Sequence, residues 1–129
     1  TSTIWQTARS ATATVSQIGG INNASNIEQS GLNIGDSGLT ATVIQTGGIG
    51  NQSTIIQTAG TVSAGLTATV IQDGGSGLRA FITQEGMDNV ADITQFGNDN
   101  TANVYQLATN NASTTILQSG TGNTVTVNQ

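Results

Sequence analysis

The stretch VADITQFGNDN TANVYQLATNN ASTTILQSGTGN TVTVNQ, from Val90 to Gln129, contains four copies of one short pattern. Each copy has Ile or Val two residues before a Gln. The first three copies continue with a small residue two positions after the Gln and an Asn five positions after it. The rest of the chain repeats this pattern, so internal repetition is its organising feature.

The repeated glutamines recur in steps of 11 or 12 residues, interrupted by one step of 16 and one of 15. They are Gln6, Gln17, Gln29, Gln45, Gln57, Gln72, Gln84, Gln95, Gln106, Gln118 and Gln129. The aliphatic residues two positions earlier are Ile4, Val15, Ile27, Val43, Ile55, Val70, Ile82, Ile93, Val104, Ile116 and Val127. Residues 1–129 are therefore predicted to form a single repeat domain of half-repeats centred on these glutamines, with long loops at 30–39 and 58–66.

Each half-repeat is predicted to form one β-strand. Residues four and two before the Gln, the Gln itself and the residue two after it lie on one side of a strand, because side chains alternate with a period of two. This inner face reads small residue, Ile or Val, Gln, then Gly or Ala. The predicted turn residues, where Asn tolerates the left-handed region, are Gly19, Asn22, Gly47, Gly86, Asn89, Gly97, Asn100, Asn111, Gly120 and Asn123.

Two arrangements satisfy this pattern, an antiparallel meander and a coil. The meander brings neighbouring copies together in opposite directions. A coil instead stacks each copy in parallel on the copy two before it, which aligns Gln with Gln and lets the amide side chains bond along the stack. The intervening strand supplies the crossover that parallel pairing requires. The sequence therefore predicts an all-β fold, a parallel cross-β solenoid with two strands per turn, able to stack into a filament.

The two long steps indicate which strands share a turn of the coil. If turns are paired from the C-terminal end, both insertions fall between pairs and emerge from one edge of the solenoid, as insertions in repeat proteins do. The first strand is left over, which gives about five and a half turns. The chain begins at Thr1 rather than Met, which is consistent with a removed leader.

Composition narrows the function classes. Aromatic residues make up 3% of the chain, there is no Pro, and charged residues make up 7%, so a conventional globular core is implausible and backbone ladders can run uninterrupted. The net charge is −5 with only two basic residues, which argues against a nucleic-acid partner. No apolar run approaches 18 residues, so we expect no membrane insertion.

The repeats resemble the later portion of the curlin repeat, which in full begins with a Ser six positions before its first Gln. In this later portion one residue separates the Gln from a Gly, two residues separate the Gly from an Asn, one separates the Asn from an Ala, and three separate the Ala from a second Gln. The segments Gln84–Gln95 and Gln95–Gln106 fit this pattern throughout, and the segment from Gln17 fits with one extra residue. The resemblance implies a bacterial functional amyloid: an extracellular, cell-surface fibre of the biofilm matrix. It also implies a secretion pore and a nucleator subunit as partners.

The terminal segments favour the same interpretation. Thr1–Ala8 and Thr124–Gln129 are uncharged strands without the charges, Pro or covering helix that guard a soluble edge. Both are templates for another copy of the chain, so we expect a homopolymer stacked end to end.

Other functions have less support. With no His or Cys, and with no carboxylate pair at inner positions, we expect no catalytic, cofactor-binding or metal site, and the acidic residues Asp88, Asp92 and Asp99 fit no calcium loop. The rival is an ice-binding, or other carbohydrate- or surface-binding, solenoid. Its face would be the outward Thr-Ala-Thr triplets at 12–14, 40–42 and 67–69, which end where Val90 and Asp92 replace the threonines.

Overall fold

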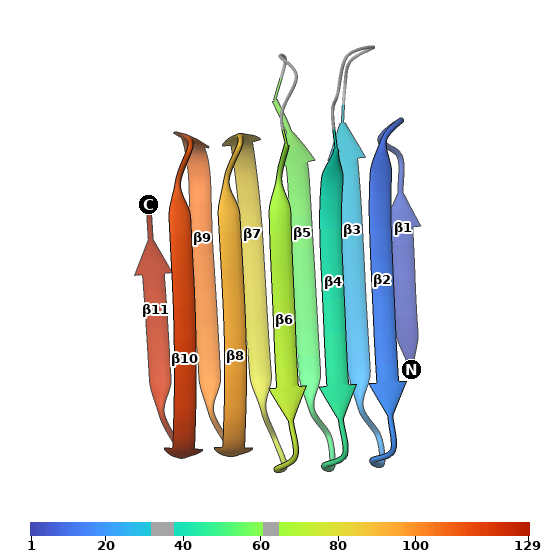
Figure 1. Cartoon of the computed structure of the whole chain (residues 1–129), viewed down its shortest axis with the longest axis vertical. Coiled ribbons are helices and arrows are strands. Elements are labelled where there is room, and N and C mark those ends of the chain that lie inside the picture. Colours follow the sequence, from blue (N-terminus) through green and yellow to red (C-terminus); the bar gives the residue numbers. More distant parts are fainter. Residues whose placement is uncertain (32–37, 61–64) are drawn as a thin grey trace.

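The computed structural model describes residues 1–31, 38–60 and 65–129. Within these ranges the regular structure is entirely β, as predicted (Figure 1). The strands are β1 (Ser2–Gln6), β2 (Ala11–Ile18), β3 (Ala24–Gly31), β4 (Leu39–Thr46), β5 (Gln52–Ala59), β6 (Thr67–Asp73), β7 (Arg79–Met87), β8 (Val90–Asn98), β9 (Thr101–Asn110), β10 (Ser113–Thr121) and β11 (Thr124–Asn128).

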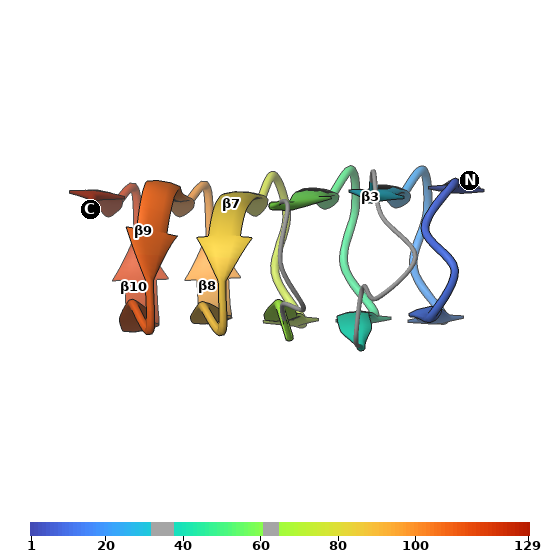
Figure 2. The same cartoon turned by 90° about the horizontal axis from the view of Figure 1, so that it is seen from above.

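The described strands form two parallel sheets. The odd-numbered strands make a six-stranded sheet in the order β1-β3-β5-β7-β9-β11, and the even-numbered strands make a five-stranded sheet in the order β10-β8-β6-β4-β2. The chain alternates between the sheets, which lie as two layers in Figure 2. This is a β-solenoid of about five turns with two strands per turn, and the predicted fold class is confirmed.

The register aligns equivalent positions of the repeat. In the six-stranded sheet Gln6 pairs with Gln29, Gln29 with Gln57, and Gln57 with Gln84. In the five-stranded sheet the pairing of Gln17 with Gln45 begins a column that continues to β10. A slip of one residue would turn every inner side chain outward, so the alternating pattern of the repeat fixes this register.

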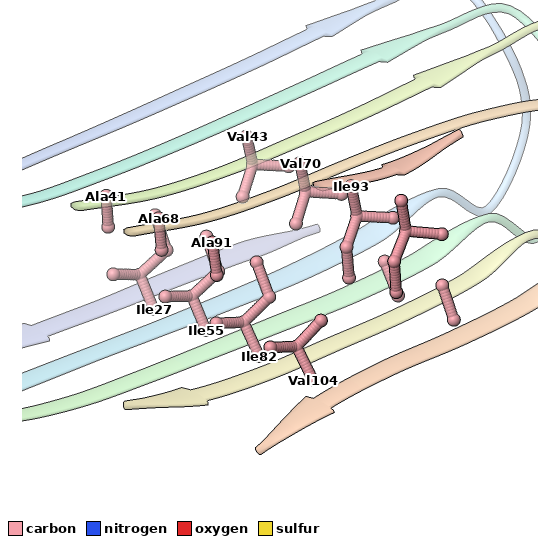
Figure 3. Packing of buried hydrophobic residues seen from close by; sticks show 13 residues of the cluster. Ile27, Ala41, Val43, Ile55, Ala68, Val70, Ile82, Ala91, Ile93 and Val104 are labelled. Atoms are coloured by element: carbon pink, nitrogen blue, oxygen red, sulfur yellow. The ribbon is translucent and has the colours of Figure 1, made fainter. Parts of the chain in front are cut away.

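The core fills the space between the sheets with small and β-branched side chains (Figure 3). Columns of Ala and of Val or Ile from the five-stranded sheet face the Ile and Val column of the six-stranded sheet. Thirteen residues form the buried cluster: Ile27, Ala41, Val43, Ile55, Ala68, Val70, Ala80, Ile82, Ala91, Ile93, Ala102, Val104 and Ile116. β-Branched side chains suit this packing because they are stiff and pack well on a pleated surface.

The two long connections are shorter than predicted. Ser30 and Gly31 belong to β3, and Leu39 opens β4. The second predicted loop likewise overlaps β5, which runs to Ala59. Residues 32–37 and 61–64 of these loops lie outside the described residues. The strands extend because Leu39, Ala59 and Leu66 form a second small buried cluster at this end of the core. Since β3 and β5 are parallel neighbours, both connections leave from the same edge, which we call the insertion edge.

The small residue two positions after the Gln does not always stay in a strand. After Gln17, Gln45 and Gln72 it is the first glycine of a double-glycine bend, with positive φ. In the pairing of β7 with β9 the register shifts between Gln84 and Gly86, so that Gly86 pairs with Thr109. Ala108 takes a φ of 53° at this place. The inner face is therefore regular through the Gln, and it diverges after the Gln according to the length of each bend.

Candidate functional site: the glutamine ladders

The repeated glutamines form two continuous ladders of side-chain amides. In the six-stranded sheet each Nε2 donates to the Oε1 of the next rung, from Gln6 to Gln29 at 2.7 Å through to Gln106 and Gln129 at 3.0 Å. The five-stranded sheet has the same chain of bonds, starting from Gln17 and Gln45 at 2.6 Å. The other steps measure 2.8–2.9 Å. The structure thus brings together all eleven glutamines predicted from the sequence, six in one ladder and five in the other.

Each ladder also bonds to the opposite sheet, a feature that the repeat did not reveal. The second Nε2 hydrogen of Gln57 reaches the Thr40 backbone carbonyl oxygen at 3.0 Å, and that of Gln72 reaches the Gln52 carbonyl oxygen at 2.9 Å. The acceptor lies five residues before the Gln of the opposite strand in both cases. The same relation holds for Gln29, Gln45, Gln84, Gln95, Gln106 and Gln118. The glutamines therefore tie the two sheets together as well as the rungs.

Burial makes these bonds important. Seven glutamine side chains are 0% exposed: Gln29, Gln45, Gln57, Gln72, Gln84, Gln95 and Gln106. A buried amide without partners costs several kcal/mol, whereas a fully bonded network in a low-dielectric interior is favourable and rigid. In the last turn the larger Thr114 replaces the usual Ala or Ser. Its hydroxyl joins the network, accepting from Gln106 at 3.1 Å and donating to Gln129 at 2.9 Å.

The predicted turn asparagines divide into two groups. Asn22 and Asn111 adopt the left-handed region as expected, both with a φ of 57°. Asn89, Asn100 and Asn123 also lie in the bends between strands, but they do not adopt the left-handed region. In these bends the residue just before the Asn has the positive φ, namely Asp88, Asp99 and Gly122.

The physical reason is that these asparagines turn inward and cap the bend. Asn100 is fully buried, its Nδ2 donates to the Phe96 and Gly120 carbonyl oxygens at 2.7 and 3.0 Å, and its Oδ1 accepts from the Asn123 backbone at 2.9 Å. In the bends after Gln17 and Gln45, which are one residue longer, this role moves one position later. Asn23 and Asn51, absent from the predicted set, occupy it, and the Asn23 Oδ1 accepts from the Asn51 backbone at 3.0 Å. The change of bend length was the available signal.

The outermost rungs are less covered than the middle ones. All five residues of β1 are exposed, and β11 alternates between exposed and half-buried. Ile4 is 44% exposed although its equivalents in the middle of the stack are completely buried. The aliphatic and glutamine columns are thus open at both ends of this 129-residue chain.

The outer faces carry the remaining polar and aromatic residues. On the six-stranded sheet Phe81 and Tyr105 pack with their ring centroids 5.5 Å apart and their planes tilted by 46°. Among the described residues no group of three His, Cys, Asp or Glu is placed to hold a metal ion. In the same part of the chain, no helix has the length and apolar character needed to cross a membrane.

Comparison with known proteins places this architecture. The model of the curlin associated repeat matches residues 64–97 and 97–129, just over half of the chain. The chain belongs to the curlin-repeat family. The family is structural and non-enzymatic. No curated protein and no solved structure gives a significant match.

The curlin geometry extends beyond the matched residues. Before residue 64 the structure has the same parallel register and the same ladder bonds, for example from Gln29 to Gln57 at 2.8 Å. The N-terminal rungs of this curlin-repeat chain therefore use the same inner columns as the matched half.

Proposed function

We propose that this curlin-repeat chain is the structural subunit of an extracellular, cell-surface amyloid fibre of the curli type. The fibre forms by end-to-end stacking and serves as biofilm matrix, in adhesion and as a surface coating. The observation that carries the proposal is the unbroken pair of glutamine ladders, which reach both outermost rungs. The contact that holds one rung on the next inside the chain is the same contact that would hold one copy on another.

The backbone of the outer rungs supports this proposal. In β11 the Gln129 N–H donates inward to the Tyr105 carbonyl oxygen at 2.9 Å. Because N–H and C=O groups alternate direction along a strand, Thr126 and Asn128 direct theirs away from β9. An exposed row of unpaired backbone groups is a template for another strand. A second copy supplies such a strand, and repeated addition gives an open filament rather than a closed ring.

The proposal includes the partners that the family suggests. They are a pore that exports the chain and a nucleator subunit that starts the fibre, besides the chain itself. The low charge content, with two basic residues in 129, favours self-association over nucleic-acid binding. We propose no catalytic activity, consistent with the structural character of the family.

The first experiment is fibre diffraction or electron cryo-microscopy of the protein incubated in dilute buffer. Long unbranched filaments with a meridional spacing of about 4.8 Å are expected from strand stacking. A stable monodisperse monomer would refute the proposal.

A substitution at the outer edge tests the mode of assembly. Thr126→Pro removes an outward N–H that the chain itself does not use, and an edge strand tolerates Pro. We expect the variant to keep its circular dichroism spectrum and to lose seeded elongation. Thr126→Ala keeps the N–H and should elongate normally. Equal elongation of the two variants would contradict stacking through β11.

A second candidate function rests on a separate observation. The register aligns Thr12 with Thr40 and Thr67, while the threonines two residues later form a parallel outward column. This regular array of hydroxyl and methyl groups is the kind of surface that an ice-binding solenoid presents. It ends at Val90 and Asp92 in the next rung. Under this alternative a soluble monomer is expected to show thermal hysteresis. A monomer without thermal hysteresis would refute the ice-binding function.

A further inference from the structure

The two sheets end on different strands. Among the described strands, β1 and β11 are the outermost members of the six-stranded sheet, while the five-stranded sheet runs from β2 to β10. Figure 2 shows the two termini in the same layer, at opposite ends of the stack. Within these 129 residues, each end of the stack is therefore a half-turn step, with one sheet protruding beyond the other.

We propose that successive copies of this 129-residue chain in a fibre are related by a half-turn about the fibre axis, an inference that rests on the proposed function. In this arrangement β1 of one copy pairs with β10 of the preceding copy, and β2 pairs with β11. Each copy then alternates which layer holds its six-stranded sheet. The step at one end fills the step at the other, and both sheets continue without a gap.

Simple translation along the axis does not achieve this fit. It would place β1 on β11, within the same layer. The position beside β10 would stay empty, so one strand would be missing from the five-stranded sheet in every copy. The apolar core beside β10 and β2 would then stay open to water, and the hydrophobic stabilisation gained by covering it would be lost.

The backbone groups of the two steps match in direction. The Thr7 N–H donates to the Gln29 carbonyl oxygen at 2.9 Å. The backbone N–H and C=O groups of Thr7, and by alternation those of Trp5 and Thr3, therefore point toward β3. The backbone N–H and C=O groups of the intervening residues Ser2, Ile4 and Gln6 then point away from β3, toward the preceding copy. On β10 the backbone groups at the alternate positions of the repeat point outward. The equivalent group on β8 shows this direction, because the Val90 N–H donates to the Ala112 carbonyl oxygen of the next rung at 2.8 Å. β1 and β10 thus offer the two halves of one parallel ladder.

The side chains of β1 and β10 match as well. In the register of the solenoid Ile4 would cover Ile116, and Gln6 would continue the ladder beyond Gln118. Trp5 would lie beside Leu117, and these are the two most exposed large apolar side chains of the described residues, at 66% and 70%. Translation would set Trp5 beside the polar Asn128 instead.

The inference predicts the helical repeat. A half-turn assembly rises about 26 Å per copy, which is five and a half strand spacings of about 4.8 Å, and rotates each copy by about 180° plus the small sheet twist. Translation requires six spacings, about 29 Å, with no half-turn. Helical reconstruction of filaments separates the two values.

Cross-linking provides the direct test, since the chain has no Cys. Thr3→Cys combined with Thr115→Cys places two thiols side by side across the half-turn interface, at about the 4.8 Å spacing of paired strands. Thr3→Cys combined with Thr126→Cys is the matched control, which brings its thiols together only under translation. Filaments of each variant are treated with a short bis-maleimide and then dissolved. In a half-turn fibre, the first variant should yield covalent multimers and the second should remain at least tenfold less cross-linked.

The outcomes separate this inference from the proposed function. Filaments in which only the control pair cross-links would overturn the half-turn and leave the fibre proposal standing. Filaments in which neither pair cross-links would also overturn it. If wild-type protein forms no filament, the proposed function fails first. Labelling with a monofunctional maleimide shows that the thiols of each variant are reactive before assembly.

Discussion

Replacing Gln72 by Glu tests the glutamine ladder at a fully buried rung. Gln72 is 0% exposed in the middle of the five-stranded sheet. Its Oε1 accepts from Gln45 at 2.8 Å, and its Nε2 donates to Gln95 at 2.9 Å and to the Gln52 carbonyl oxygen at 2.9 Å. Gln72→Glu keeps the shape of the side chain and replaces a double donor by an acceptor.

The magnitude follows from the protonation state of the introduced carboxyl. When protonated it can donate one hydrogen bond in place of two, so one buried acceptor loses its partner, at a cost of about 1–3 kcal/mol. Ionisation in this site is far less favourable, because the carboxylate would face two oxygen acceptors in a dry interior. The pKa of this carboxyl in the folded chain is therefore raised well above the value of about 4.3 that Glu has in an unfolded chain.

The sign of the pH dependence is fixed by this raised pKa. Below about pH 4.3 the group is protonated in both states, and only the loss of about 1–3 kcal/mol remains. As the pH rises, the unfolded chain ionises and the folded chain does not, so the variant loses about 1.4 kcal/mol per pH unit. At pH 7 the additional loss is about 4 kcal/mol. The loss levels off once the pH passes the raised pKa.

Urea unfolding, monitored by circular dichroism at pH 3 and pH 7, measures this effect as the difference between variant and wild type. The matched control is Gln52→Glu, whose side chain is exposed on the outer face and should change stability by less than about 1 kcal/mol at either pH. The seeded growth of Gln72→Glu should fail at pH 7 and recover at pH 3. A loss that is equal at both pH values would refute the argument, because it would show that water reaches the ladder.

Two smaller predictions concern the bends and the small inner column. Gly74→Ala and Gly75→Ala both place a side chain at positive φ, at 66° and 63°, but only the Cβ at Gly75 would overlap the Gly97 carbonyl oxygen. We therefore expect a loss of about 1–2 kcal/mol for the first and a much larger loss, or failure to fold, for the second, measured by thermal unfolding. Similar stability of the two variants would show that the rungs do not stack this closely at the bend. Ser25 and Ser53 have buried hydroxyls without a partner among the described residues. Ser25→Ala and Ser53→Ala should therefore each leave the free energy of unfolding, measured by urea unfolding, unchanged or raise it by up to about 1 kcal/mol. A clear decrease would indicate a bonded hydroxyl.

The sequence was sufficient to predict most of the fold because its signals repeat. One Gln with an Ile two residues earlier has little meaning alone. The same pair in one frame from Gln6 to Gln129 specifies strands, their inner face and the parallel register, since the side-chain period of a strand is two. The structure has this register in every pair of neighbouring strands up to the bends. The two insertions and the odd first strand also followed from the spacing alone.

The bends could not be predicted in the same detail. The conformation of a bend depends on which of its residues turns inward. The choice of that residue depends in turn on the bend of the neighbouring rung. Asn100 caps a bend by bonding to a carbonyl of the next rung, at Gly120. Neither its inward direction nor the positive φ of Asp99 follows from turn preferences alone. The bond from each Gln to the opposite sheet was hidden for the same reason, because it depends on how the two layers are offset.

The ladders explain why a chain with so few aromatic residues stacks in one way. An aliphatic column alone would tolerate a slip of two residues, because Ile would still meet an apolar or small neighbour. The same slip would move the Gln57 amide from Gln84 to the aliphatic Ile82, leaving buried donors and acceptors unpaired. Each misplaced rung would cost several kcal/mol. The glutamines therefore supply register more than cohesion. The same selection would act on an incoming copy, which must present Gln6 to Gln118 and Gln17 to Gln129 at once. In the register of this solenoid, the half-turn arrangement is the one that meets both conditions.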